Sequence, residues 1–198
     1  MKKTEEKTNA LRLLDAQGVA HQTHSYDPDA VDGEAVAALT GIEPDRVFKT
    51  LVTVGASRRY YVFDVPVNCT LSLKKAAHAV GEKNIAMLPQ KDLLPLTGYI
   101  HGGCSPLGMK KLFPTCIDET AQLFDTICVS AGRRGLQVEL RPDDLCAVIG
   151  AEYADLTEEG GAGWRRSIPT GANRWAAWCC AMGACCWRGI PMARARAG

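Results

Sequence analysis

Apolar and polar residues alternate in short segments along the first 160 residues, and most of these segments end at a glycine. Apolar residues spaced three and four positions apart are typical of one face of a helix. Five segments with this spacing predict helices: 8–18, 32–41, 72–81, 89–98 and 141–150. Thr8 and Ser72 are the expected N-caps of two of them, because a side-chain oxygen there can accept from a free backbone N–H.

Seven runs rich in β-branched and aromatic residues predict strands. They cover residues 21–26, 46–55, 60–66, 113–118, 125–132, 136–140 and 152–156. Only four residues separate the second run from the third, so we expect these two to form a hairpin in a core sheet. This mixture of helices and strands indicates one compact α and β domain in residues 1–160.

The last part of the chain has a different composition. All four tryptophans, four of the nine cysteines and six arginines lie in residues 161–198, which contain no lysine and no acid. Residues 1–160 hold 17 basic and 22 acidic residues, a formal charge of −5. We interpret residues 161–198 as an out-of-frame or read-through extension, because GC-rich DNA encodes such residues in the wrong frame. A basic aromatic RNA-binding tail is the alternative. Its Cys-Cys pairs lack the C-x2-C spacing of zinc sites.

Neither a membrane span nor a secretory signal is evident in the sequence. The chain contains no run of 18 apolar residues, and its first 14 residues lack an apolar signal core. We therefore expect a cytoplasmic protein with no membrane contact. In that compartment, the nine cysteines are expected to be free thiols, ligands or catalytic groups rather than disulfides.

Residues 97–111, TGYIHGGCSPLGMKK, are the first candidate ligand-binding segment. Their glycines allow the backbone to approach a ligand closely, and Ser105 before a proline favours a turn. Such a loop can point backbone N–H groups at a carbonyl oxygen, an oxyanion or a phosphate. From the residues alone, a sharp surface connection explains the segment equally well. The nearby Cys104 and His101 also raise the question of a nucleophile with its base, or of a metal site.

The second candidate is VFKTLV, residues 47–52, where Lys49 and Thr50 interrupt an apolar strand. On an alternating strand, Lys49 shares a face with Leu51, which places it on the interior side of a cleft. A buried lysine is unfavourable unless it meets an anion or an open pocket. An edge-strand lysine that discourages aggregation is the other explanation, and the residues alone favour it.

These two segments occur together with HSYDPD, VPVNCTLSLKKAAHAVGEKNIAML, PTCIDETA and ICVSAGRRGLQVEL. In this order and spacing, the chain resembles the YbaK family of aminoacyl-tRNA deacylases, which is related to the editing domain of bacterial prolyl-tRNA synthetases. The resemblance covers nearly all of residues 8–156 and implies an α+β fold, a single domain in which helices flank a curved mixed β-sheet. The extension after Gly160 has no counterpart in the family pattern.

The resemblance implies a trans-editing enzyme that cleaves the ester between a wrong amino acid and the 3′ end of tRNA, above all in Cys-tRNA(Pro). In the mechanism proposed for the family, the substrate's own thiol attacks its carbonyl, while the protein supplies orientation and electrostatics. No cofactor and no metal are implied, and prolyl-tRNA synthetase is a candidate partner. Two alternatives stay open: a deacylase for tRNA charged with alanine or another small amino acid, and a noncatalytic module that binds tRNA or a synthetase.

The family pattern also implies roles for single residues. Lys49 matches the active-site lysine, and Tyr26 matches an aromatic residue that lines the pocket or stacks on adenine. Thr50 and Ser130 match polar positions near the pocket. Gln137 stands where relatives often have aspartate, so the substrate amine would meet a neutral side chain, which leaves the amino-acid specificity open.

Within the glycine-rich loop, the resemblance assigns the contribution to the backbone. The amides around Gly102 and Gly103 are expected to contact the substrate, and Ser105 either takes part or is an ordinary turn hydroxyl. Cys104 and His101 match variable positions of the family, so we expect Cys104 to be a small apolar residue beside the loop.

Two basic pairs flank the presumed site, Lys110–Lys111 and Arg133–Arg134, and both are candidates for contacts with tRNA phosphates. The acidic balance of residues 1–160 argues against broad nonspecific affinity for RNA. We therefore expect the contacts with tRNA to be local.

Overall fold

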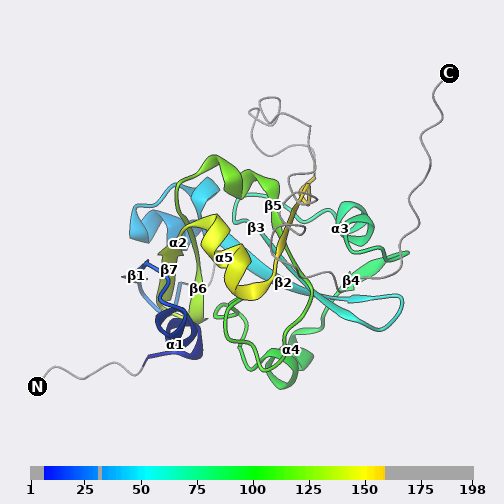
Figure 1. Cartoon of the computed structure of the whole chain (residues 1–198), viewed down its shortest axis with the longest axis horizontal. Helices are drawn as coiled ribbons and strands as arrows, with labels where there is room; N and C mark the ends of the chain where they lie inside the picture. The colour runs from blue at the N-terminus through cyan, green and yellow to red at the C-terminus, as the bar shows by residue number, and fades with distance from the viewer. Residues whose placement is uncertain (1–6, 31–32, 159–198) are drawn as a thin grey trace, which may run out of the picture. The chain divides into compact units, whose positions relative to one another are not determined.

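The computed structural model of the protein describes residues 7–30 and 33–158 (Figure 1). The helices are α1 (Asn9–Ala16), α2 (Gly33–Thr40), α3 (Leu73–Ala79), α4 (Gln90–Thr97) and α5 (Pro142–Ile149), with two short 3-10 helices, η1 (Pro44–Arg46) and η2 (Glu119–Leu123). These residues fall in one compact unit. The interpretation of residues 161–198 as an extension concerns a segment outside the described residues.

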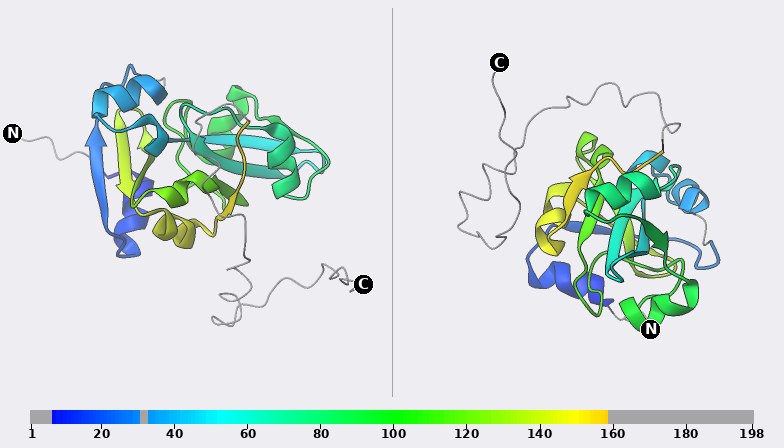
Figure 2. Two further views of the ribbon diagram at one scale, coloured as in Figure 1. Left: turned by 90° about the horizontal axis from the view of Figure 1, so that it is seen from above. Right: turned by 90° about the vertical axis from the view of Figure 1, so that its right-hand side faces the viewer.

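Two sheets form the centre of this unit. The smaller sheet is antiparallel, in the order β1 (His21–Ser25), β7 (Leu136–Leu140), β6 (Ile127–Arg133). The larger sheet has the order β4 (Ile85–Met87), β2 (Phe48–Gly55), β3 (Tyr60–Pro66), β5 (Thr115–Asp118), β8 (Glu152–Ala154). Strands β3, β5 and β8 run parallel. In the left view of Figure 2, the β2–β3 hairpin extends away from the smaller sheet.

The predicted hairpin is present, with Phe48 of β2 paired with Pro66 of β3. Its side chains alternate as the sequence indicates. Leu51 packs against the buried cluster beneath α3, whereas Val52 packs into a cluster on the opposite face of the sheet. Lys49 therefore starts from the same face as Leu51, as the alternation of a strand requires.

The two sheets meet where β2 begins. Val47, which precedes β2, forms an isolated parallel bridge with Cys128 of β6. Both residues pack with Val67 and with Ala37 of α2 in one small buried cluster. This junction brings the start of the hairpin next to the smaller sheet.

The largest buried cluster lies on the other face of the smaller sheet. Leu14 of α1 and Leu145 of α5 pack there against Val138 and Leu140 of β7. Burying such side chains contributes roughly 1.5–3 kcal/mol each. This face of the sheet is therefore closed by helices, and its opposite face carries the polar side chains described below.

The predicted α+β fold is confirmed, with the strands divided between two sheets. The sequence did not predict β4, η1 or η2, because segments of three to five residues carry too little pattern. Thr8 caps α1 as predicted, since its Oγ1 accepts from the Leu11 N–H at 3.3 Å. Ser72 stands at the N-cap of α3 but makes no capping hydrogen bond with its side chain. Over the residues described, no helix has both the length and the apolar character needed to cross a membrane.

Candidate active site

Lys49 lies on β2, close to the junction of the two sheets. Its side chain is half-buried, and its ammonium group donates a hydrogen bond to the backbone oxygen of Val67 at 3.0 Å. The side chain of Val67 packs with Cys128 of β6. The Lys49 cation is therefore held beside the polar face of the smaller sheet.

Gln137 and Ser130 are direct neighbours on that sheet. Gln137 of β7 pairs with Ser130 of β6 on one side and with His24 of β1 on the other. Gln137 is 5% exposed, and its Oε1 has no hydrogen-bond partner in the part of the chain that the structure describes. A buried acceptor of this kind favours a ligand that brings an N–H group.

Tyr26 follows β1 and contacts the turn between β6 and β7. Its backbone N–H donates to Gly135 O at 3.0 Å. Gly135 adopts φ +80°, and a Cβ there would lie 3.0 Å from the Tyr26 oxygen and from Pro28. Burial raises the pKa of the Tyr26 hydroxyl above its usual value of 10.0, so the hydroxyl stays neutral and can donate.

The glycine-rich loop begins with a tight turn at residues 100–103. The Gly103 N–H donates to Ile100 O at 3.0 Å, and Gly102 adopts φ +81°. A glycine with positive φ at the third position is the requirement of a type II turn. The turn therefore uses the Gly103 amide, which leaves Gly102 as the stronger of the two predicted donors to a substrate.

This loop packs closely against the turn between β6 and β7. A Cβ at Gly103 would lie 3.0 Å from the backbone of Arg133 and of Arg134. The Arg134 side chain donates from Nε to His101 O at 2.9 Å. The backbones of the loop and of the turn are thus in close contact. Arg133 and Arg134, the predicted arginine pair, contribute to this contact.

Cys104 and Ser105 lie on the buried side of the loop. Ser105 is fully buried, and its Oγ accepts from the Leu107 N–H at 3.2 Å, which is the role of a turn hydroxyl. Cys104 is 8% exposed and packs with Tyr99 and with residues of the hairpin. Burial, reinforced by the charge of Asp64, raises the pKa of the Cys104 thiol to about 12. An uncharged, buried thiol is a poor nucleophile.

Thr50 points to the opposite face of β2 from Lys49. Its hydroxyl donates to Oδ1 of Asp64 at 2.6 Å. Asp64 is completely buried, which raises the pKa of its carboxyl to about 7, and its Oδ2 has no hydrogen-bond partner among the residues described. Sequence reasoning missed Asp64, although an acid within the apolar run YYVFDVP was a visible signal.

The predicted site residues therefore fall into two groups. Tyr26, Ser130, Gln137 and the loop at Gly103 gather around the turn between β6 and β7, and Lys49 is held beside β6 by its contact with Val67. The Thr50 side chain points to the other face of the hairpin, where it meets Asp64. The Ser105 side chain is buried and bonds to the backbone of its own loop. The first group is the candidate active site.

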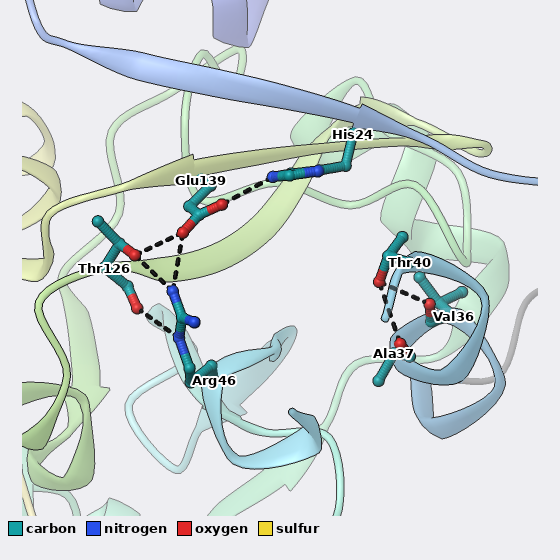
Figure 3. A network of polar contacts seen from close by, with 7 residues as sticks. All are labelled: His24, Val36, Ala37, Thr40, Arg46, Thr126 and Glu139. Carbon is teal, nitrogen blue, oxygen red and sulfur yellow. Dashed lines mark hydrogen bonds and ion pairs between the residues drawn. The ribbon is translucent and has the colours of Figure 1, made fainter. Parts of the chain in front are cut away.

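The same sheet also carries a polar network that the sequence did not predict (Figure 3). His24 Nε2 lies 2.7 Å from Oε2 of Glu139, and Arg46 of η1 donates to Oε1 of Glu139 at 2.8 Å. Thr126 also donates to Oε1 of Glu139. The Thr126 hydrogen bond makes the largest contribution to lowering the pKa of Glu139, and His24 and Arg46 act in the same direction. Glu139 is therefore a carboxylate.

Two surface hollows lie away from the candidate active site. One, of about 290 Å³, is lined by Tyr60, Leu88, Asp92, Pro95 and Leu96. The other, of about 340 Å³, is lined by Arg46, Leu123, Phe124, Asp125 and Thr126. Neither hollow is lined by a predicted site residue. The candidate site is therefore defined by the place where the loop's backbone and the predicted side chains come together, and not by a surface hollow.

Comparison with known proteins identifies the class to which this fold and site belong. The sequence pattern of the aminoacyl-tRNA editing domain matches residues 27–148. The chain therefore belongs to the aminoacyl-tRNA editing domain family, which confirms the family resemblance drawn from the sequence.

Individual relatives agree with this assignment. The chain is 46% identical over 158 residues to an Enterococcus faecalis protein assigned as Cys-tRNA(Pro)/Cys-tRNA(Cys) deacylase EbsC, and the match covers 79% of this chain and 96% of that protein. A solved structure described as a trans-editing enzyme for prolyl tRNA synthetase is 26% identical, with a TM-score of 0.69, over 76% of this chain and 95% of its own. The solved structure of hypothetical protein APE2540 is 20% identical, with a TM-score of 0.71 over 76% of this chain and all of its own, and shows the fold alone.

Proposed function

We propose that the protein is a trans-acting aminoacyl-tRNA deacylase whose principal substrate is Cys-tRNA(Pro). The family supports the reaction, and the E. faecalis relative supports the substrate. The observation that carries the proposal is the position of Lys49, a half-buried cation on an apolar strand beside the polar face of the smaller sheet. A cation in such a place stabilises negative charge that develops on a carbonyl oxygen.

The substrate's terminal ester lies, in this proposal, between Lys49 and the turn at residues 100–103. The Gly102 N–H and the Lys49 ammonium group act on the carbonyl oxygen. The amide of Gln137 accepts from the substrate amine through Oε1, its unpaired oxygen. Tyr26 contacts the terminal ribose or adenine, since an aromatic ring with a neutral hydroxyl can both pack and donate.

The substrate itself supplies the nucleophile. Its thiol sulfur attacks the carbonyl carbon, the ester bond to the ribose oxygen breaks, and the thiol proton passes to that oxygen. Water then opens the cyclic thioester to give free cysteine. The protein contributes orientation and charge stabilisation, which fits a loop whose own cysteine, Cys104, is buried and uncharged.

Prolyl-tRNA synthetase is the proposed partner, because cysteine and proline are close enough in bulk that a binding pocket separates them weakly. The tRNA is bound locally, with Arg133 and Arg134 beside the loop and Lys110 and Lys111 after it as phosphate contacts. We propose that the enzyme works in the cytoplasm, where tRNA is charged.

A substrate panel tests the proposal. The full chain is mixed with tRNA(Pro) charged with cysteine, alanine, serine or proline, and with Cys-tRNA(Pro) whose thiol has been alkylated. We expect rapid turnover of unmodified Cys-tRNA(Pro) only. Equal turnover of the alanine or alkylated substrates would instead indicate a deacylase that uses water directly. Binding of tRNA with no turnover at all would indicate a noncatalytic module.

A further inference from the structure

We infer that His24, Cys128 and Glu139 form a binding site for a zinc ion. The three residues come from the three adjacent strands of the smaller sheet, β1, β6 and β7. Their donor atoms, an imidazole nitrogen, a thiol sulfur and a carboxylate oxygen, all lie within 4.8 Å of one another. Neither the family nor the relatives' names assign a metal to this chain, and the sequence predicted none.

The strand register explains why the three side chains meet. Cys128 and Glu139 are direct partners across β6 and β7, so their side chains project from the same face. His24 pairs with Gln137, two positions before Glu139, so it reaches Glu139 diagonally. The imidazole Nε2 already lies 2.7 Å from Glu139 Oε2. Three strands thus present one donor each to a common point.

The surroundings favour a bound ion over a surface contact. Cys128 is fully buried, and the side chains of His24 and Glu139 are 21% and 18% exposed. Removal of water strengthens the attraction between a cation and its ligands. His24 remains accessible enough from solvent for an ion to enter.

The donor set selects the type of ion. Nitrogen, sulfur and carboxylate oxygen together are ligands of Zn²⁺, which is bound by three protein groups where a water completes the tetrahedron. Zinc bonds of about 2.0–2.3 Å require ligand atoms to lie a little over 3 Å apart. The contact between His24 and Glu139 therefore has to lengthen by roughly half an ångström through a small rotation of the His24 side chain.

Arg46 and Thr126 shape this site from outside. Both donate to Oε1 of Glu139, which fixes the carboxylate and leaves Oε2 directed at His24. Hydrogen bonds to the ligands commonly orient them for a metal. The Arg46 charge opposes a cation, so we expect moderate affinity rather than that of a structural zinc finger. On binding, the Cys128 thiol loses its proton to solvent. His24 Nε2 gives up the proton that it donates to Glu139, so that the neutral imidazole carries its proton on Nδ1.

The test uses the full chain with cysteines 179, 180, 185 and 186 replaced by serine, so that these four thiols cannot bind metal. Metal-free protein is titrated with Zn²⁺ by calorimetry, and with Co²⁺ by absorption. We expect one ion per chain, a higher Tm with zinc, and a near-ultraviolet sulfur-to-cobalt band from Cys128.

Two variants locate the ion. His24→Ala should weaken binding by at least about tenfold, and Cys128→Ala should abolish the sulfur-to-cobalt band. His21→Ala is the matched control, since His21 lies on the same strand but outside the cluster, and it should bind as the parent does. The metal-free Tm of each variant shows whether it is folded. Failure of the parent to bind stoichiometrically, or binding that persists in both variants, would show that the cluster is an ion-pair network only.

Discussion

The Thr50 hydroxyl donates a 2.6 Å hydrogen bond to a completely buried carboxyl, that of Asp64. No cation contacts Asp64 within the described residues, and burial raises its pKa to about 7. A carboxyl in this state is neutral below neutral pH and becomes a buried charge above it. The hairpin next to the candidate site therefore contains a group whose charge changes within the working range of most proteins.

The first prediction concerns the pH dependence of stability. The folded chain holds the Asp64 proton more tightly than the unfolded chain, where the pKa is near 3.8. The free energy of unfolding should therefore fall as the pH rises from about 4 to about 7, by a total on the order of 4 kcal/mol. In Asp64→Asn this contribution is absent, so the Tm of the variant relative to wild type should increase between pH values of about 4 and 7. Asp92→Asn, an exposed control, should show no such trend. A constant Tm difference across this range would refute the assignment.

The second prediction is that Lys49→Ala stays folded and loses deacylation. The side chain is only half-buried, so its removal should leave the Tm within a few degrees of wild type. Loss of the cation should lower kcat for Cys-tRNA(Pro) by at least about 100-fold. Lys74→Ala, on the exposed face of α3, should keep the wild-type rate. Wild-type turnover by folded Lys49→Ala would remove Lys49 from the mechanism.

The third prediction is that Cys104→Val keeps the rate within about twofold, because an apolar replacement of similar volume suits an apolar site. Cys104 packs among Val52, Val62 and Tyr99, and burial leaves its thiol uncharged. The measurement is single-turnover deacylation together with mass spectrometry of the quenched enzyme. A folded but inactive variant, or an acyl group found on Cys104 of the wild type, would contradict the role of the substrate thiol.

The fourth prediction tests the fit between the loop and the β6–β7 turn. In Gly103→Ala, the new methyl group would meet backbone atoms of Arg133 and Arg134 at 3.0 Å. Backbone cannot move aside as a side-chain end can, so the loop should shift and deacylation should slow by about tenfold. Gly81→Ala is the control. The φ of +70° at this position is strained for alanine, but no atom beyond the adjacent residues lies within 4 Å of the added Cβ. That variant should lose about 1–2 kcal/mol of stability and no activity. Equal deacylation rates for Gly103→Ala and Gly81→Ala would show that the position of the loop does not affect catalysis.

The fifth prediction is that a chain ending at Gly160 is active and at least as soluble as the full chain. The last described residues are bound to the rest of the domain by hydrogen bonds from their backbone N–H groups. The Leu156 N–H donates to Asp118 Oδ2 at 3.0 Å, and the Glu158 N–H donates to Thr70 O at 3.0 Å. The match to the E. faecalis relative also uses only 79% of this chain, yet it covers 96% of that protein. Activity, thermal melting and tRNA affinity at fixed salt compare the two chains. Unfolding of the shorter chain, or a several-fold loss of tRNA affinity, would show that residues 161–198 contribute.

Most of the fold could be predicted from local patterns in the sequence. The cap of α1, the glycine stops and the alternation of β2 each depend on a few neighbouring residues, so they could be predicted from the sequence. Strand β4 was not predicted, because Ile85–Met87 is a strand through its pairing with β2 and has no clear strand pattern in its own sequence. The division into two sheets likewise depends on which strands pair at long range.

The candidate site could be predicted only through the family motifs. Lys49 and the loop glycines are visible as departures from an apolar or ordinary pattern. That the Gly103 amide closes a turn could not be predicted, because it depends on a single φ angle at Gly102. The network of His24 with Glu139 joins residues 115 positions apart, and no local signal connects them.

The pairing of β1 with β7 has a consequence for synthesis on the ribosome. His21 of β1 is made early, but its partner Leu140 emerges only when the domain is almost complete. Until then β1 lacks its neighbour in the sheet, since β7 is the strand it pairs with. Contacts this distant along the chain form late and slowly. A nascent chain therefore acquires Gln137, Ser130 and Tyr26 in their final arrangement only after β7 has emerged, so a copy that ends before Leu140 lacks this arrangement.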